Sequence, residues 1–577
     1  MTANRNSKST YILVFIIILA ITLRFYHIDY QSVWLDEICS ITEANPAIKW
    51  SDLEATLLVS DPHPQLYFVF LKTMFLLFGN STLIARILSA IIGVVGVYCF
   101  YLLSKEFANR KVAIISTLLL SVNYFHIYYS QEVRMYGLLF LFTVLSFYRL
   151  ILFVKNKNLR NTTWYGISTG LMLLTQFFGL FVLASQLLIL LFYFLKIERS
   201  QRSKYLQKSM IAGGIIVVLF LPALKIFIAT TKKRYAAIEP TTIDTILQIF
   251  KDFAQDSYII IILSIIAIGY YFLNFNKESL GKESKESQTV LILLTWIIVA
   301  LTIPIVLSYL ISPMISSRYF ITILPAILIL IAMGIDKIRH KKVKILAVSI
   351  FVSYSLFHLI YSTEYYTKVN KTQFREVTNH VVNNNFNADP VVSNLKWYLL
   401  YFFNNEKIQG AVIQSEFEDF VLNMSTGAIK SNSFWFLGAF GNPLELSKAS
   451  ENYLADNFTI VNNVDLYDCW TKHYISKNIK NKNTSIVSIK LSNLTDSNWD
   501  GGVHRRRNIF LAENTVVNQN LMNNADRLKF KDGRTVTIIE HKRVGNYVQI
   551  FIKQENAYSL KEVAAFPNSI EILYQNE

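Results

Sequence analysis

Two adjacent carboxylates, Asp36 and Glu37, lie in a polar stretch between two apolar segments near the start of the chain. A carboxylate in such a place can act as a general base toward a hydroxyl group or as a ligand for a cation. The alternative is that the pair only places favourable negative charge at the start of a helix. Because neighbouring residues of a helix point about 100° apart, we expect at most one of the two carboxylates to face any given cavity.

A second polar group follows at Asp61-Pro-His63-Pro, and Tyr67 comes shortly after it. Each proline ring fixes φ and excludes a continuous helix. The loop is therefore expected to hold Asp61 and His63 at a set place. A single histidine outside a membrane is commonly without function. This one lies between two prolines and close to an aspartate, which makes it a better candidate for a site.

Further polar residues lie where apolar segments end or begin. The stretch around Gln131 contains Glu132 and Arg134, and Arg318 comes directly before another apolar segment. Polar groups next to hydrocarbon are costly unless they are paired, so they are functional candidates by default. On one helix Glu132 and Arg134 would not face each other, so each is expected to have a partner elsewhere. Arg318 suits a phosphate ligand, although an arginine there could also simply extend to the membrane interface.

Composition and long apolar runs indicate a membrane protein. The 577 residues are 53% hydrophobic and only 17% charged, and the mean hydropathy is +0.34. Soluble domains are about 25% charged. A membrane-spanning helix needs about 20 apolar residues. On this criterion the sequence predicts about eleven spans: Tyr11–His27, Thr82–Leu103, Lys111–Phe125, Tyr136–Val154, Thr163–Phe178, Leu180–Leu195, Ser209–Ala229, Tyr258–Leu273, Thr289–Leu307, Tyr319–Ile335 and Ile345–Tyr361.

Lysine and arginine gather in every second loop between these spans, and such loops are expected to lie in the cytoplasm. The basic loops are Lys105–Lys111, Lys155–Arg160, Lys196–Lys208, Lys277–Lys285 and Lys337–Lys344. The N-terminus then lies inside, and the chain beyond residue 361 lies outside. The net charge of +16 therefore does not require a nucleic acid partner. All the polar candidates fall on the outer face of the membrane.

The same patterns predict three regions. Residues 1–361 form a helical membrane domain with an outer loop, residues 29–81, that carries interfacial helices. Residues 362–480 alternate between predicted helices and strands, which is typical of a small α/β domain. Residues 481–577 contain short strands separated by Asp-Gly and Gly-Asn turns, which fits an antiparallel β-rich module. Both C-terminal regions are expected outside the cytoplasm.

Several of these motifs, in this order, resemble a known family. They are Trp34-Leu-Asp36-Glu37, Asp61-Pro-His63-Pro-Gln-Leu-Tyr67, Arg86-Ile-Leu-Ser, Tyr129-Ser-Gln131-Glu132-Val-Arg134-Met-Tyr136 and Ser317-Arg318-Tyr319-Phe…Leu-Pro325. They look like polyprenyl-phosphate-sugar-dependent glycosyltransferases of the GT-C fold, in the bacterial branch near protein O-mannosyltransferases and lipid A aminoarabinose transferases. The resemblance covers roughly residues 11–375. Gln65 departs from it, since the family usually has a second proline there, and His63 argues mildly against an aminoarabinose substrate.

The resemblance implies an enzyme that transfers a sugar from a polyprenyl-phosphate donor to an acceptor hydroxyl, with inversion at the anomeric carbon. It implies that Asp36 is the base, with Glu37 as the second choice. Arg134, Arg318 and His63 would hold the phosphate, and Asp61 and Glu132 would orient those cations or the sugar. The other substrate-binding candidates are Tyr67, Arg86, Gln131, Tyr136 and Tyr319.

The nature of the leaving group explains why this chemistry needs few acids. A phosphate is already a weak base, so it requires charge stabilisation and no protonating acid, whereas a glycosidase needs two carboxylates. A divalent metal is compatible with the carboxylates, but no ligand cluster in the sequence requires one. The sequence names neither the sugar nor the acceptor, so lipid, protein and polysaccharide acceptors stay open. The resemblance implies the bacterial cytoplasmic membrane.

Two other functions are compatible with many spans and outer cations. A transporter or flippase for a lipid-linked sugar usually has inverted repeats and polar groups near the membrane midplane, whereas the polar groups here gather at the outer ends. An O-antigen-type ligase would carry a large outer loop between late spans. Here the bulk of the outer chain follows the last span, so the transferase is preferred.

Overall fold

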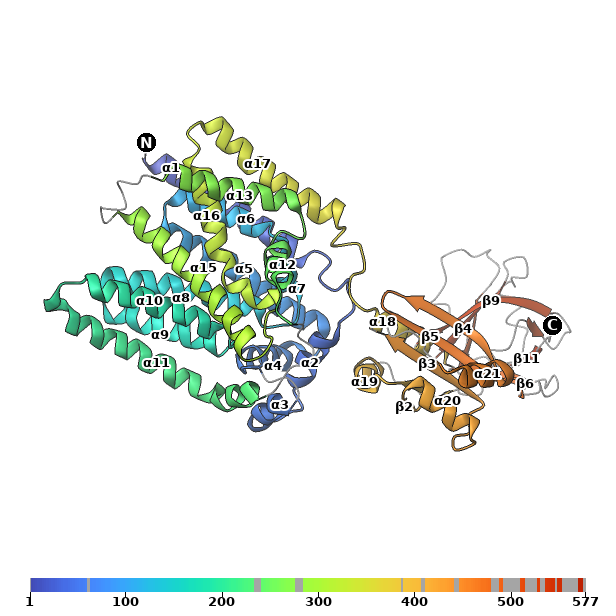
Figure 1. The fold of residues 1–577 in the computed structure, drawn as a ribbon. Helices are drawn as coiled ribbons and strands as arrows, with labels where there is room; N and C mark the ends of the chain where they lie inside the picture. The colour runs from blue at the N-terminus through green and yellow to red at the C-terminus, as the bar shows by residue number, and fades with distance from the viewer. Residues whose placement is uncertain are drawn as a thin grey trace. The chain divides into compact units, whose positions relative to one another are not determined.

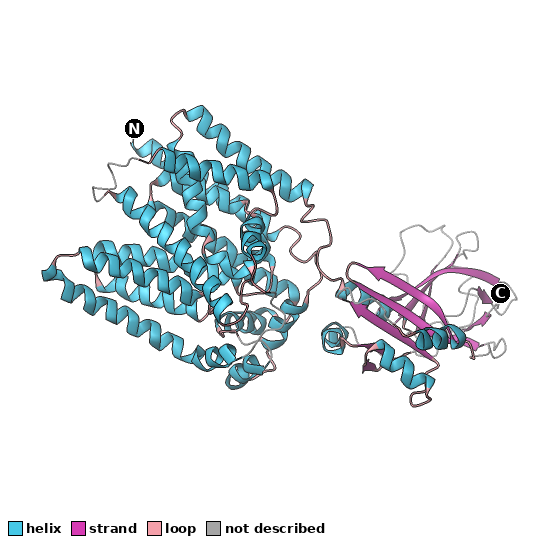
Figure 2. Ribbon diagram, viewed as in Figure 1, coloured by secondary structure: helices cyan, strands magenta, loops and turns pink. Residues whose placement is uncertain are grey.

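The computed structural model describes residues 2–59, 63–232, 240–275, 284–385, 388–405, 410–439 and 446–478, and six further strands between 487 and 573. The chain divides into two compact units, one formed by Met1–Gln31 and Leu35–Lys368 and the other by Ser32–Trp34 and Val369–Glu577. The described regular elements of the first unit are all helices, and the second unit combines helices with strands (Figures 1 and 2).

The helices of the first unit are α1 (Thr2–Phe25), α2 (Leu35–Glu43), α3 (Leu53–Val59), α4 (Leu66–Phe78), α5 (Thr82–Phe107), α6 (Arg110–Ser121), α7 (Tyr124–Gln131), α8 (Tyr136–Asn156), α9 (Leu159–Leu173), α10 (Gly179–Lys196), α11 (Arg199–Lys232), α12 (Ile243–Phe253), α13 (Tyr258–Leu273), α15 (Lys285–Leu310), α16 (Leu324–Lys337) and α17 (Lys341–Phe357). Short turns of tighter or wider helix are η1 (Trp50–Asp52), η2 (Ser317–Thr322) and η3 (His358–Ser362). The short helices α2, α3, α4, α7 and α12 gather at one end of this unit, on the right in Figure 1.

Six of the described helices are long and apolar enough to cross a membrane: α5, α8, α10, α11, α15, and α17 continued by η3. The count rises to eight if the bent pairs α6–α7 and α12–α13 each form one span. The polytopic helical prediction is therefore confirmed, whereas the number eleven stays a prediction. The segments predicted at Thr163–Phe178 and Tyr319–Ile335 are represented by α9, of 15 residues, and α16, of 14 residues. Both are shorter than the roughly 20 residues that a full crossing needs.

The chain between α1 and α5 forms the three short helices α2, α3 and α4. The most apolar of the three is α4, which corresponds to a helix that the sequence predicts to lie at the membrane interface. It buries Tyr67, Phe68, Leu71 and Phe75 and exposes Leu76, Leu77 and Phe78. The next helix, α5, begins where the Ser81 hydroxyl accepts a hydrogen bond from the Ile84 amide, as is usual for an N-cap serine. Tyr67 lies in the first turn of α4 and Arg86 in the second turn of α5, so the starts of these helices set the positions of both residues.

A break between α7 and α8 is the backbone feature that matters most for the site. The Asn123 carbonyl side chain accepts from the His126 amide and so caps α7, and its amide group donates to the Phe253 carbonyl of α12 at 2.9 Å. The helix ends at Gln131, and α8 begins only at Tyr136. Residues 132–135 are therefore outside a regular helix, which leaves their backbone amides available to side chains from other elements.

The second unit contains a five-stranded sheet with the order β2-β1-β3-β5-β4. Its strands are β1 (Val391–Ser393), β2 (Val412–Gln414), β3 (Ser433–Ala439), β4 (Phe458–Leu466) and β5 (Cys469–Ser476). β1 is parallel to β2 and β3, whereas β5 is antiparallel to β3 and β4. The accompanying helices are α18 (Phe374–Asn384), α19 (Lys396–Asn405), α20 (Phe417–Ser425) and α21 (Lys448–Asn457). Aromatic residues such as Phe417, Phe434 and Phe436 form the core between α20 and the sheet.

The remaining strands pair into a six-stranded sheet with the order β6-β11-β8-β9-β10-β7. They are β6 (Val487–Lys490), β7 (Ile509–Glu513), β8 (Arg527–Lys529), β9 (Thr535–Val544), β10 (Tyr547–Ile552) and β11 (Ser569–Leu573). All its pairings that are described are antiparallel, as the sequence predicts. The Asp532-Gly533 and Gly545-Asn546 turns lie outside the described residues.

Candidate active site

The two adjacent carboxylates lie in the first turn of α2 and have different partners. Glu37 is fully buried, whereas the Asp36 side chain is 21% exposed. On a helix their side chains point about 100° apart. The buried apolar residues Ile38 and Ile41 of α2 anchor the helix against the rest of the unit. The consequence is that one carboxylate faces the protein interior and the other faces a more open space.

Glu37 forms a buried two-pronged ion pair with Arg86 of α5. The Arg86 Nε and Nη2 atoms donate to the two Glu37 carboxylate oxygens at 3.1 and 3.0 Å. The Val133 amide, in the break between α7 and α8, also donates to Glu37 at 3.1 Å. Arg86 is 1% exposed and further donates to the Ile28 and Gln31 carbonyls. The pair therefore ties together α2, α5 and the 132–135 break.

Asp36 forms an ion pair with Arg318, which lies in η2. The Arg318 Nη1 donates to the Asp36 Oδ2 at 2.7 Å, and the side chains are 28% and 21% exposed. The Arg318 guanidinium carbon lies 5.7 Å from the ring centre of Tyr136 and 5.6 Å from that of Tyr319. These distances fit cation–π contacts. Although burial disfavours the charge, Tyr136, Tyr319 and Asp36 outweigh it and raise the pKa of Arg318 above its ordinary value.

Arg134 approaches α2 from the same side as Arg318. Its Nη1 donates to the Ser40 hydroxyl at 3.1 Å and to the Asp36 carbonyl at 3.3 Å. Since Ser40 is four residues after Asp36, both lie on one face of α2. Three predicted residues, Asp36, Arg134 and Arg318, thus converge from α2, from the 132–135 break and from η2. The Asp36 carboxylate lies in a cationic surrounding that can also receive an anion.

Other predicted residues lie next to this arrangement and contact the helices around it. Gln131 donates to the Arg24 and Tyr26 carbonyls at 3.1 and 3.0 Å, and its carbonyl accepts from the Tyr365 hydroxyl at 2.9 Å. It therefore joins α1 and the segment after η3 to the end of α7. Glu132 is buried, at 1% exposure, and directly precedes Val133. The Tyr67 hydroxyl is paired with Ser89 of α5 at 2.9 Å and is buried.

The loop was predicted to hold Asp61 and His63 at a set place. His63 is half-buried and lies three residues before the start of α4. Asp61 lies outside the described residues. The part of the prediction that concerns Asp61 and its loop therefore stays untested.

Two residues that contact this site were missed at the sequence level. Ser40 receives the Arg134 hydrogen bond, and Tyr365 holds Gln131. The four-residue spacing from Asp36 to Ser40 was a signal that could have identified the first. Tyr365 carries no such signal, because it is more than two hundred residues away from Gln131 in the sequence.

Within the described residues, no group of three or more histidine, cysteine, aspartate or glutamate side chains is arranged to hold a metal ion. Asp36 and Glu37 are instead committed to arginine partners. The arrangement of these residues thus provides cations for an anionic group and one accessible carboxylate.

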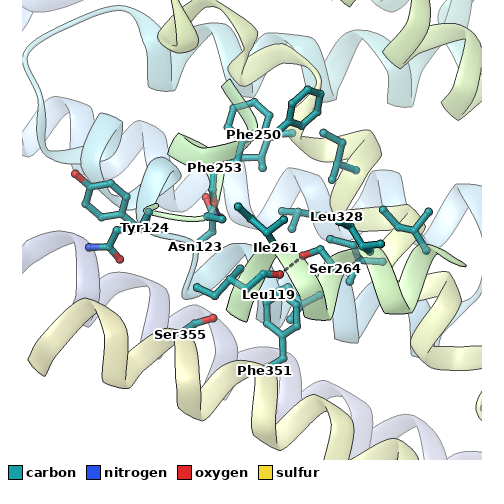
Figure 3. Close-up of a pocket in the computed structure, with 18 of the residues that line it drawn as sticks. Leu119, Asn123, Tyr124, Phe250, Phe253, Ile261, Ser264, Leu328, Phe351 and Ser355 are labelled. Atoms are coloured by element: carbon teal, nitrogen blue, oxygen red, sulfur yellow. Dashed lines mark hydrogen bonds between the residues drawn. The ribbon is translucent and has the colours of Figure 1, made fainter. Parts of the chain in front are cut away.

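A large apolar cavity lies between α6, α12, α13, α16 and α17 (Figure 3). Its volume is about 480 Å³, and its walls include Leu119, Phe250, Phe253, Ile261, Leu328 and Phe351. None of the predicted site residues lines it. It is nevertheless connected to the site through α12, which packs against η2 and, through Phe253, against Phe125 of α7 at a ring distance of 4.8 Å. The cavity can hold hydrocarbon, because its walls are mostly apolar, with a few polar residues such as Asn123, Ser264 and Ser355.

Comparison with known proteins places this fold. A family model described as dolichyl-phosphate-mannose-protein mannosyltransferase matches residues 62–226. No curated protein sequence matches the chain. The structure of ArnT from Cupriavidus metallidurans bound to undecaprenyl phosphate is 12% identical, with a TM-score of 0.50, and the match covers 80% of this chain and 97% of that one.

Two further solved structures match over smaller shares. The archaeal oligosaccharyltransferase AglB from Archaeoglobus fulgidus, in complex with an inhibitory peptide and a dolichol-phosphate, is 11% identical with a TM-score of 0.45, over 75% of this chain and 69% of that one. The S. cerevisiae protein O-mannosyltransferase Pmt1-Pmt2 complex bound to the sugar donor is 16% identical with a TM-score of 0.33, over 38% and 34%. The likeness to ArnT confirms the predicted GT-C fold, and the matched family model agrees with a glycosyltransferase of that type.

Proposed function

We propose that this chain is an integral membrane glycosyltransferase that transfers a sugar from a polyprenyl-phosphate donor to a hydroxyl group of an acceptor at the outer face of a bacterial cytoplasmic membrane. The GT-C fold and the family match over residues 62–226 support the class of enzyme. The observation that carries the proposal is the different state of the two carboxylates. Asp36 is partly exposed beside two arginines, whereas Glu37 is enclosed by Arg86 and the Val133 amide.

In the proposed reaction Asp36 is the base and the surrounding cations receive the phosphate. The acceptor hydroxyl oxygen attacks the anomeric carbon from the face opposite the phosphate, and its proton passes to Asp36. The bond from the anomeric carbon to the phosphate oxygen breaks, and the electron pair stays on polyprenyl phosphate. Attack from the opposite face inverts the anomeric carbon. Arg318 and Arg134 lie where they can stabilise the charge that develops on the phosphate.

In the proposed reaction Arg318 can donate hydrogen bonds to two groups, the Asp36 carboxylate and the donor phosphate. In the structure it donates to Asp36 at 2.7 Å. When a donor phosphate is present, the same guanidinium can donate to it through its other N–H groups, since arginine offers five donors in a fixed plane. A shift of Arg318 from Asp36 toward the phosphate would leave the Asp36 carboxylate oxygen open to a hydrogen bond from the acceptor hydroxyl when the donor is bound.

The lipid part of the donor needs an apolar place within the membrane. The cavity of about 480 Å³ beside α12 offers such a place, and α12 packs against the turn that carries Arg318.

Glu37 and Arg86 join α2 to α5, while Gln131 and Tyr67 join the neighbouring helices. We assign these four residues positioning roles. Glu132, His63 and Asp61 are proposed to orient the sugar or the cations.

The experiment uses membranes that carry wild type or Asp36→Asn, supplied with radiolabelled polyprenyl-phosphate hexose. We expect wild type to move label from the lipid to another fraction, and Asp36→Asn to lose transfer by about 10²- to 10⁴-fold, the usual range for a general base, at unchanged expression. Glu54→Gln is the matched control, because Glu54 is an exposed carboxylate of the same outer region and pairs only with the exposed Lys225 among the ion pairs described. Equal transfer by wild type and Asp36→Asn would remove Asp36 from the mechanism. Label that crosses the bilayer without being transferred would replace the transferase by a transporter.

A further inference from the structure

A basic pocket lies at the end of the helical unit opposite to the active site. Its volume is about 260 Å³, and four lysines line it, Lys155, Lys157, Lys196 and Lys285, with Glu106 as the only acidic residue among the described lining residues. The lysines come from the end of α8, the residue that follows α8, the end of α10 and the start of α15. Elements far apart in the sequence thus bring like charges to one cavity.

The position of the basic pocket is set by α8. Tyr136, beside Arg318, is the first residue of this helix, and Lys155 and Lys157 lie at its other end. A helix of 21 residues is about 30 Å long, which is close to the hydrocarbon thickness of a bilayer. In Figure 1 the ends of α8 and α10 and the start of α15 accordingly lie on the left of the helical unit, away from α2 and α12. The basic pocket therefore lies at the opposite membrane surface from Asp36.

Within the described part of the chain, two of these lysines, Lys157 and Lys285, contact only uncharged acceptors. Lys155 pairs with Glu106 at 2.7 Å. Lys285 donates to the Ala108 carbonyl at 2.7 Å and Lys157 to the Gln201 amide oxygen at 3.4 Å, and both acceptors are uncharged. Lysines in the last turn of a helix are favoured by the helix dipole, which accounts for Lys155 and Lys196. It does not account for Lys285, since a cation at the start of a helix is disfavoured.

The walls of the basic pocket combine two kinds of surface. Tyr193 and Gln288 form its polar wall and join α10 to α15 through a hydrogen bond of 3.2 Å. Ile151, Val154 and Ile292 form an apolar wall. The outer surface of the same helix α10 is strongly apolar, with Leu187, Leu188, Leu191 and Leu195 each about half exposed or more. A ligand that fits this cavity has an anionic group for the lysines and hydrocarbon for the isoleucines and the neighbouring leucines.

We propose that the basic pocket binds the phosphate of an anionic phospholipid, with an acyl chain along α10. Basic pockets between membrane helices near the cytoplasmic surface suit anionic headgroups. A free phosphate offers the same anionic group but no hydrocarbon, so it would use the lysines alone. This site is independent of the proposed transfer reaction, because it shares no residue with it and lies at the other membrane surface.

The test measures lipid binding by the purified full chain in detergent micelles, with native mass spectrometry. The protein is titrated with dioleoylphosphatidylglycerol or dioleoylphosphatidylcholine, and in a third series with inorganic phosphate. The variant is Lys157→Gln/Lys196→Gln, which leaves the Lys155–Glu106 pair intact. The matched control is Lys341→Gln/Lys342→Gln, because these two lysines lie at the start of α17 at the same membrane surface but do not line the basic pocket. Both variants are first checked for a single elution peak in gel filtration.

We expect wild type to bind phosphatidylglycerol more tightly than phosphatidylcholine. Removing one lysine near an anionic lipid weakens binding about fivefold, so the double variant should bind phosphatidylglycerol about 25-fold more weakly. The control should bind like wild type. Equal binding of the two lipids, or equal losses in both variants, would overturn the proposal. If inorganic phosphate alone binds with the same sensitivity to the variant and phosphatidylglycerol has no advantage, the ligand is a soluble phosphate and the lipid is excluded.

Discussion

At the scale of single residues, two neighbouring carboxylates serve different purposes because the helix turns between them. Glu37 meets Arg86 in a fully buried pair, and Asp36 meets Arg318 at a partly exposed place. A buried ion pair contributes little net stability compared with apolar residues of similar size, but removing one partner leaves a buried charge. The Glu37–Arg86 pair should therefore behave as a structural unit whose two members cannot be changed separately.

Replacement of Arg86 by methionine tests this unit. We expect Arg86→Met alone to reduce the free energy of unfolding by about 3–5 kcal/mol, because Glu37 stays buried without its cation. The double variant Glu37→Leu/Arg86→Met should lose less than the single variant, since no charge is then left uncompensated. The measurement is thermal unfolding of the detergent-purified protein, followed by tryptophan fluorescence. If the losses of Glu37→Leu and Arg86→Met simply add in the double variant, the two side chains are not coupled.

Arg318 tests the part of the site that receives the donor. Arg318→Gln removes the cation and should reduce transfer by about 10²- to 10³-fold, the range seen when one stabilising donor of an active site is lost. Arg318→Lys keeps the charge but not the planar group of donors, so its rate should fall between those of wild type and Arg318→Gln. The measurement is the initial rate of transfer against donor concentration. Arg339→Gln, at the other membrane surface, is the control, and a rate for Arg318→Gln equal to that of the control would exclude Arg318.

The sequence predicted the residue types of the site better than their partners. Asp36, Arg134 and Arg318 are brought together as the shared outer position implies. Arg86 and Gln131 were predicted to bind substrate, which stays a prediction, and the structure pairs them with Glu37 and with backbone carbonyls. The reason is that a polar residue beside hydrocarbon must be paired in any case. Pattern alone cannot distinguish a partner in the protein from a partner in a ligand.

At the scale of elements, α13 and α16 approach each other closely. A Cβ atom added at Gly334 of α16 would lie 1.9 Å from the Ala267 carbonyl oxygen of α13. Gly334→Ala must therefore separate the two helices. Because η2 directly precedes α16, such a movement would also shift Arg318 relative to Asp36.

We expect Gly334→Ala to cost about 1–3 kcal/mol in the free energy of unfolding, as overpacking usually does. The matched control is Gly269→Ala in α13, where an added Cβ has no atom within 4 Å. This control should be neutral or should stabilise the helix by up to about 1 kcal/mol. Thermal unfolding in detergent measures both variants. Equal unfolding temperatures for the two variants would contradict the close packing of α13 and α16.

Element boundaries were predictable where apolar runs were long and unpredictable where they were short. The segments at Thr82–Leu103 and Tyr136–Val154 correspond to α5 and α8 within a few residues. In the second unit the predicted alternation of helices and strands is present, for example in α18 and β4, but the sequence carries no clear signal for α20 and β5. β5 is a central strand between β3 and β4. Its mixed sequence, Cys-Trp-Thr-Lys-His-Tyr-Ile-Ser, shows no clean alternation of apolar and polar residues.

At the scale of the whole molecule, the sequence predicted the fold because the spacing of apolar runs and basic loops applies to the entire chain. It could not fix the number of spans. α9 and α16 are buried helices of 15 and 14 residues, and a helix shielded from lipid by neighbouring helices need not be as long as an exposed one. Their buried residues, such as Thr169 and Ile329, show this shielding. The orientation of these two helices decides on which surface every later loop lies.

Alkaline phosphatase fusions can determine this orientation, because the enzyme is active only after export from the cytoplasm. If α9 and α16 both cross the membrane, fusions after Phe177 and after Ser316 should be active, and fusions after Lys157, Ile197 and Lys337 should be inactive. A fusion after Lys368 should be active, with the second unit outside. Fluorescent-protein fusions at the same positions should show the opposite pattern, which controls for expression. An inactive fusion after Phe177 together with an active one after Ile197 would mean that α9 does not cross. That result would reverse the predicted side of every loop after α9, including the one that carries Arg318.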